Sequence, residues 1–117
     1  MPYEQRARIA VDIAEMRPDL MLSNPAALEN FVKSNVIAMS TFADQGATPQ
    51  AIQGLHQAAL TSAAVGDPEK FAKEIASFPA KAFSAFSSVS PNYNQMELLQ
   101  FISGISTAAQ DLSLIHI

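Results

Sequence analysis

The sequence predicts an all-α protein, built as an irregular (orthogonal) bundle of five to six short helices. Two observations predict this class. At four places a residue able to cap a helix is followed by proline and a helix-forming run, and between these places apolar residues recur with helical spacing. Before residue 111 no run alternates apolar and polar residues as a half-buried strand does. The four places are Asn24-Pro25, Thr48-Pro49, Asp67-Pro68 and Ser90-Pro91.

The first helix is predicted over residues 2–17. Ile9, Ile13 and Met16 share one of its faces, and charged side chains line the opposite face. We expect Pro18 to end this helix, because the residue before a proline is pushed out of the α region. A second helix is predicted downstream, where a continuous apolar stripe begins after the first cap and runs to about residue 45.

The third helix, predicted over residues 49–65, contains no Asp, Glu, Lys or Arg. Gly54, Ala58 and Ser62 recur in it every four residues, a spacing that would let another helix backbone approach closely. Because both its charge-free surface and its small side chains favour contact, we expect this helix to be the central one, covered on more than one side.

Prolines also divide the second half of the chain. Pro79 interrupts the fourth helical pattern, and a proline inside a helix costs about 3 kcal/mol. We therefore expect a kink or break at Pro79, with two pieces, about 68–77 and 79–88. The last helix is predicted over residues 91–109. It is expected to bury Met96, Leu99, Ile102 and Ile105.

Composition limits the function classes. The 117 residues suit one domain, taken as residues 1–111, and 49% apolar content can supply its core. A net charge of -4 argues against a nucleic-acid partner, since such affinity comes mainly from neutralising phosphates. The absence of cysteine removes disulfides and thiolate metal sites. We find no secretory signal and no membrane span, so we expect a soluble, cytoplasmic protein.

The last six residues, 112–117, differ in character from the helices before them. Their sequence, Leu-Ser-Leu-Ile-His-Ile, resembles over its whole length a one-frame translation of the transposon-end adapter used to prepare sequencing libraries. The resemblance implies a non-native tail that packs poorly, with a natural chain that continues past Asp111. The alternative is an apolar tail that completes the last helix, which would require Leu112, Leu114 and Ile115 all to be buried.

The sequence shows no constellation of residues that carries catalysis or binds a cofactor. His56 is the only histidine before residue 112, and no carboxylate lies at helical spacing from it, so we predict no metal site. As a general base it would need an orienting carboxylate from another element. Residues 43–65 resemble a helix-turn-helix only loosely, because the second helix has no basic residue to reach DNA. We predict no catalytic residue and no cofactor.

The leading hypothesis is a non-enzymatic helical module that acts through a protein partner or self-association. Its basis is the low charge, 15% of residues, since interface cores are depleted in charge. One alternative is the binding of an apolar small molecule or lipid between the helices. Another is an N-terminal fragment whose functional residues lie beyond Asp111. The candidate interface residues are Gly54, Ala58, Ser62, Tyr93 and Phe101, of which the two aromatic residues are expected to be exposed.

Overall fold

The all-α class is confirmed by a computed structural model, which describes residues 1–87 and 95–113. These residues form six helices and no strand. The order of the helices along the chain is α1 (Tyr3–Glu15), α2 (Pro18–Ser23), α3 (Pro25–Asp44), α4 (Pro49–Ala63), α5 (Pro68–Ser87) and α6 (Gln95–Ser113).

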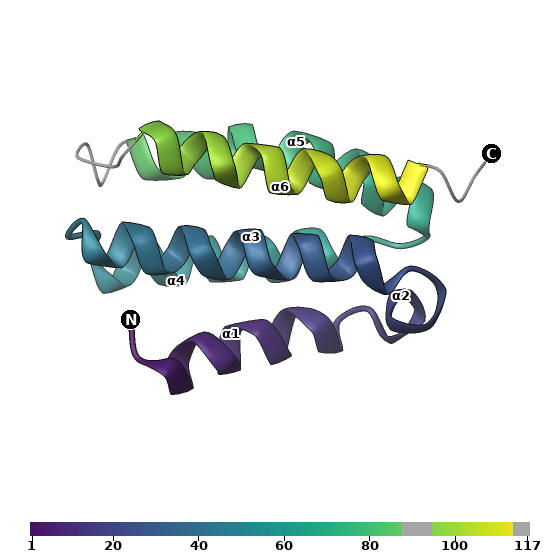
Figure 1. Cartoon of the computed structure of the whole chain (residues 1–117), viewed down its shortest axis with the longest axis horizontal. Coiled ribbons are helices and arrows are strands. Elements are labelled where there is room, and N and C mark those ends of the chain that lie inside the picture. Colours follow the sequence, from purple (N-terminus) through teal and green to yellow (C-terminus); the bar gives the residue numbers. More distant parts are fainter. Residues whose placement is uncertain (88–94, 114–117) are drawn as a thin grey trace.

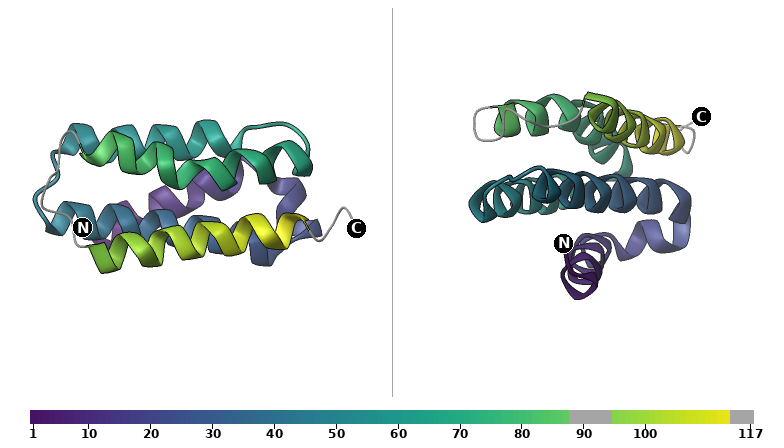
Figure 2. Two further views of the ribbon diagram at one scale, coloured as in Figure 1. Left: turned by 90° about the horizontal axis from the view of Figure 1, so that it is seen from above. Right: turned by 60° about the vertical axis from the view of Figure 1, so that its left-hand side comes forward.

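Helices α3 to α6 form an up-and-down four-helix bundle. Figures 1 and 2 show these four helices along the long axis of the molecule, each antiparallel to the one before it. α3 and α4 make the middle layer, α5 and α6 cover one side of it, and α1 lies against the other side (Figure 1). The orthogonal arrangement that we expected from short helices is not seen, because helices of 15 to 20 residues pack lengthwise.

Prolines begin α3, α4 and α5, as predicted. At each start the preceding side chain accepts a hydrogen bond from a backbone N–H, which satisfies one of the free donors of the first turn. The N–H groups of Ala27, Ala51 and Lys70 donate to the side chains of Asn24, Thr48 and Asp67 over 3.3, 3.2 and 2.9 Å. The fourth predicted start, at Ser90-Pro91, lies outside the described residues.

Pro18 ends α1 as expected and has a second role, whereas Pro79 acts differently from our expectation. Pro18 ends the path of α1, but it also begins α2, a short helix that we did not predict. Pro79 does not divide its helix, since α5 continues through it to Ser87. Pro79 is itself buried, and three neighbours on its helix, Phe71, Ile75 and Phe78, are fully buried. Burying each such side chain contributes about 1.5–3 kcal/mol, which offsets the cost of the proline.

The central helix is α3 and not α4. α3 lies against α1, α2, α4 and α6, and its buried side chains include Phe31 at the middle of the bundle. The Phe31 ring meets the rings of Phe71 and Phe78 edge-to-face, with centroids 5.6 Å apart in both pairs. α4, which we expected at the centre, leaves Gly54 open to solvent, with no atom within 4 Å of where a Cβ would stand.

α6 buries a different face from the predicted one. Met96 and Leu99, expected in the core, are 64% and 61% exposed, whereas Ile105 is fully buried as predicted. Phe101, expected at the surface, is 2% exposed and packs edge-to-face on Phe78 at 6.0 Å. Apolar residues lie on both faces of α6, so their spacing alone does not select the buried face.

The C-terminal end of α6 is packed against the bundle as far as Leu112, which is fully buried. The Asn24 side-chain amide donates a hydrogen bond to the backbone carbonyl of Asp111 over 3.0 Å, which ties the end of α6 to the start of α3. Leu112 therefore differs from our expectation of a poorly packed tail. Leu114 and Ile115 lie outside the described residues, and the non-native origin of the tail stays a prediction.

Candidate functional site

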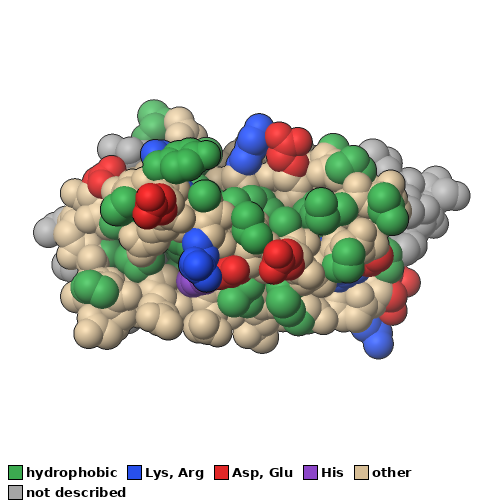
Figure 3. All heavy atoms as spheres, turned by 90° about the horizontal axis from the view of Figure 1, so that it is seen from below, with side chains coloured by type: hydrophobic (Ala, Val, Ile, Leu, Met, Phe, Trp, Pro, Cys, Tyr) green, Lys and Arg blue, Asp and Glu red, His purple; other side chains and the backbone are tan. Residues whose placement is uncertain are grey.

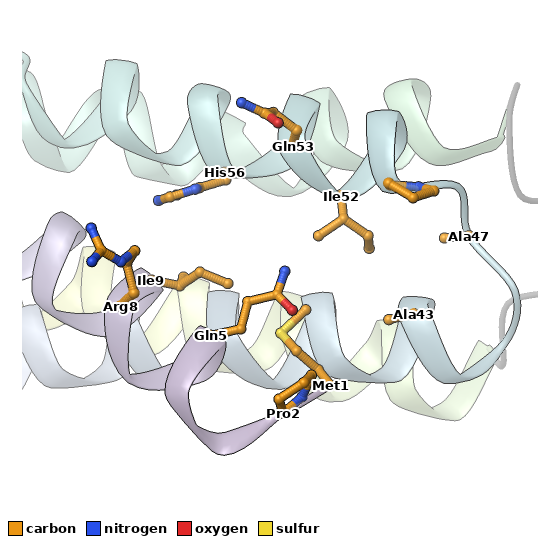
Figure 4. A pocket seen from close by; sticks show the side chains of 11 residues that line it. Met1, Pro2, Gln5, Arg8, Ile9, Ala43, Ala47, Ile52, Gln53 and His56 are labelled. Carbon is orange, nitrogen blue, oxygen red and sulfur yellow. The ribbon is translucent and has the colours of Figure 1, made fainter.

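The candidate site is a cleft of about 450 Å³ between α1, the beginning of α4 and the end of α3 (Figure 4). A cavity of this size lies in the range that small-molecule sites occupy. Its walls come from segments about 40 residues apart in the sequence. The lining residues are Met1, Pro2, Gln5, Arg8, Ile9, Ala43, Ala47, Pro49, Ile52, Gln53 and His56.

The cleft exists because α1 is attached to the bundle along only one stripe. Ile9 and Ile13 are its buried apolar residues, and both point into the packed structure. On the α4 side Ile52 and Leu55 are buried one turn apart. Between Ile9 and Ile52 the two helices leave a gap that opens to solvent (Figure 4). The floor of the cleft is therefore apolar, and its polar groups come from the flanks of the helices.

Three of the four polar side chains of the cleft lie toward one end (Figure 4). Figure 4 shows the Arg8 and His56 side chains at the same end, with Gln53 on the adjoining turn of α4. Gln5 lies in the middle, and the opposite end is formed by the apolar side chains of Met1, Ala43 and other residues (Figure 4). The ammonium group of Met1 pairs there with Asp44, over 3.6 Å. No Asp or Glu is among the lining residues. A protein of net charge -4 thus has a cleft with one guanidinium and no carboxylate.

His56 lies close to a carboxylate from another helix. Its Nε2 atom is 3.5 Å from Oδ2 of Asp12 on α1, and its side chain is 19% exposed. Nε2 is buried and has no hydrogen bond within the described part of the chain, so the two groups are near each other without being joined by one. Asp12 is a carboxylate from another helix that the sequence alone did not place near His56. Because Asp12 and His56 lie on different helices, the spacing of residues within one helix cannot predict that they meet.

The chemistry that the lining side chains offer is binding. Two amides, an imidazole and a guanidinium provide hydrogen-bond donors and acceptors, and the remaining side chains are apolar. The lining contains no side-chain hydroxyl, thiol or amine that would serve as a nucleophile next to His56. Elsewhere in the described ranges, no group of three His, Asp or Glu residues could hold a metal ion.

The far end of α1 is fixed by Arg17, a residue that we did not single out in the sequence. Its buried guanidinium donates to both carboxylate oxygens of Asp19, over 3.0 and 2.8 Å, and to the carbonyl of Val65 over 2.7 Å. It also lies over the Phe71 ring, 4.7 Å from the centroid. Because of its hydrogen bonds, Arg17 lowers the pKa of Asp19 below the ordinary value of 3.8. This clamp joins the α1–α2 corner to the end of α4.

The predicted interface residues do not form one surface. Gly54 is exposed and Ala58 is half-buried, but Ser62 is buried, with its hydroxyl 3.4 Å from a carboxylate oxygen of Glu74. Phe101 belongs to the core, as described above, so its predicted exposure is wrong. Tyr93 lies outside the described residues. The stripe formed by Gly54, Ala58 and Ser62 therefore runs from the surface of α4 into the bundle.

A second hollow of about 400 Å³ lies between α1, α2 and α3, and it is mainly apolar. Val11 and Met21 border it and are half-exposed, and the next residue, Leu22, is 90% exposed. Figure 3 views the α1 side of the molecule and shows apolar side chains spread between a few charged ones. The complete lining of this hollow is Ala10, Val11, Ala14, Met21, Pro25, Leu28, Glu29 and Val32.

Comparison with known proteins gives no relative: no family model matches this chain, and no match is found among curated proteins or solved structures. Among the described helices, none combines the length and the apolar character needed to cross a membrane.

Proposed function

We propose that this protein binds a small molecule in the cleft between α1 and α4. The observation that carries the proposal is the composition of the cleft, an apolar floor with a few polar side chains, most of them toward one end (Figure 4), which is typical of ligand sites. The proposal develops the second hypothesis from the sequence, and it moves the ligand from the interior of the bundle to the side of α1. The phenylalanine cluster fills the middle of the bundle, whereas the cleft is open to solvent.

A substitution that fills the cleft tests the proposal. Octan-1-ol serves as the probe, and its binding is followed by calorimetry and by the NMR signals of Ile9 and Ile52. We expect Ala47→Trp to abolish binding, because the indole would occupy the apolar end. Ala76→Trp is the matched control, since Ala76 is exposed on α5, away from the cleft, and its variant should bind as the wild type does. Absence of binding, or equal binding by both variants, would contradict the proposal.

A second candidate function is self-association through the corner formed by α2. Leu22 is a large apolar side chain that is 90% exposed beside the hollow bordered by Val11 and Met21. In a chain with few charged residues, such a surface is suited to protein contact, and we take a second copy of the chain as the partner to test. Sedimentation at increasing concentration should show a dimer that Leu22→Glu dissociates. Leu99→Glu, at another exposed apolar position, should leave the dimer intact. A monomer at all concentrations would exclude this function.

A further inference from the structure

We infer that the cleft between α1 and α4 takes an amphiphile with a carboxylate head group, whose carboxylate lies at Arg8 and whose apolar chain points toward Ala43 and Ala47. This inference rests on the proposed function and names the chemical class of its ligand. It is carried by the charge of the lining residues and by the order in which polar and apolar groups follow one another along the cleft.

The first argument is that the Arg8 side chain has no ion-pair partner among the described residues. Arg17, by comparison, has its guanidinium fully engaged with Asp19, Val65 and the Phe71 ring. Arg8 also lines the cleft with its guanidinium, but within the described residues it forms no ion pair. A guanidinium presents parallel N–H donors that match the two oxygens of a carboxylate, and such paired bonds are among the strongest in proteins.

The acidic residues on the outer face of α1 do not form ion pairs with Arg8. Glu4, Asp12 and Glu15 border a shallow hollow with it, yet none of them is close enough to pair with the guanidinium. Asp12 contacts His56 instead, with 3.5 Å between Oδ2 and Nε2. The imidazole thus lines the cleft while its Nε2 side faces Asp12, so that the Asp12 carboxylate is not part of the cleft wall.

The second argument is the order of groups along the cleft. Figure 4 shows Arg8 and His56 at one end, Ile9 and Ile52 in the middle with the Gln5 amide, and the apolar side chains of Met1, Ala43 and Ala47 beyond them. The ammonium group of Met1 at that far end is paired with Asp44 over 3.6 Å. An amphiphile has the same order, with a charged head followed by an apolar chain. Burial of that chain supplies affinity in proportion to the apolar area removed from water, and the head group fixes the orientation.

Three probes of equal chain length separate the head groups: octanoate, octan-1-ol and octylamine, each titrated calorimetrically below its aggregation concentration. We expect octanoate to bind most tightly and octylamine most weakly. Arg8→Gln should weaken the binding of octanoate about two- to fivefold, as loss of an exposed ion pair predicts, and leave the binding of octan-1-ol unchanged. Added salt should weaken octanoate alone, because it screens the pair.

Arg6→Gln is the matched control, because Arg6 lies on the same helix and is exposed but does not line the cleft. It should leave the affinity for octanoate unchanged. If octan-1-ol binds as tightly as octanoate, or if both arginine variants weaken octanoate equally, the inference is wrong and the proposed function stands. If none of the three probes binds, the proposed function fails and the inference fails with it.

Discussion

The four-helix bundle and the α1–α2 segment are held by different kinds of contact. In the bundle, Phe31 joins α3 to two rings of α5, and Phe78 joins α5 to α6. α1 instead buries two isoleucines, and its corner with α2 is secured by the polar contacts of Arg17. Aromatic packing closes the interior of the bundle, whereas the narrow attachment of α1 leaves a cleft. The candidate site therefore lies where the packing is least continuous.

The largest effect is expected from Phe31→Ala, which removes the ring that joins α3 to Phe71 and Phe78 of α5 inside the bundle. Truncation of a fully buried phenylalanine costs about 3–5 kcal/mol, so the variant should unfold at a much lower urea concentration. Ile37→Ala is the control on the same helix, since Ile37 is half-exposed. It should change the free energy of unfolding by about 0.5–1 kcal/mol or less. Equal losses in the two variants would contradict the proposed core.

Arg17→Ala should destabilise the α1–α2 segment and leave the four-helix bundle stable. It leaves the carbonyls at the end of α4 without their donor, and an unsatisfied buried acceptor costs about 1–3 kcal/mol. Hydrogen exchange should quicken at amides of α1 and α2 and stay slow in α5. Arg6→Ala, which changes the same charge on exposed surface, should have no such effect. Uniformly faster exchange over the whole protein would show that α1 and the bundle unfold as one unit.

Two glycines should respond in opposite directions to alanine. A Cβ at Gly104 on α6 would overlap the hydroxyl of Ser34 on α3, so Gly104→Ala should destabilise the bundle by about 1–3 kcal/mol. Gly54 on α4 has open space around it, and Gly54→Ala should stabilise its helix by about 0.5–1 kcal/mol. Ser34→Ala should recover part of the loss at Gly104. Thermal unfolding measures all three, and a stabilising Gly104→Ala would disprove the close contact.

The smallest effect is an acid sensitivity of the Arg17 clamp. The pKa of Asp19 is lowered in the folded protein, mainly by the hydrogen bond from Arg17. The contribution of Asp19 to the free energy of unfolding is therefore complete above pH 3.8 and is lost as the pH falls through the lowered pKa. The effect is small because Asp19 is largely exposed. NMR signals of α2 should shift in this acidic range, and Asp19→Asn should abolish that part of the titration. An unchanged titration in the variant would assign it to another carboxyl group.

Much of the fold is predictable from local signals. The proline starts of α3, α4 and α5 follow from capping chemistry, which involves only neighbouring residues. α2 was missed because a proline that ends one helix is equally suited to begin the next, and Pro18 does both. The prediction of the buried face of α6 was wrong because Leu99 and Phe101 lie on different faces of the same helix and both are apolar. Only its neighbours α3 and α5 decide which face is covered.

The candidate site was much less predictable than the fold. Arg8 and His56 are separated by 48 residues of chain, and nothing in their local patterns indicates that they meet. Arg17 looks like an ordinary helix-ending arginine until the end of α4 is placed beside it. Polar residues whose partners come from distant helices carry no periodic signal, so their roles depend on the packing of the whole chain.

The two walls of the cleft belong to the two regions compared above, and thermodynamic linkage follows from this placement. A ligand that touches both α1 and α4 binds only while α1 is docked, so its occupancy and the docking equilibrium are coupled. At a free concentration one hundred times its dissociation constant, such a ligand would add about 2.7 kcal/mol against undocking. The amides of α1 would then exchange hydrogen more slowly when the ligand is bound, whereas exchange in the four-helix bundle would be unchanged.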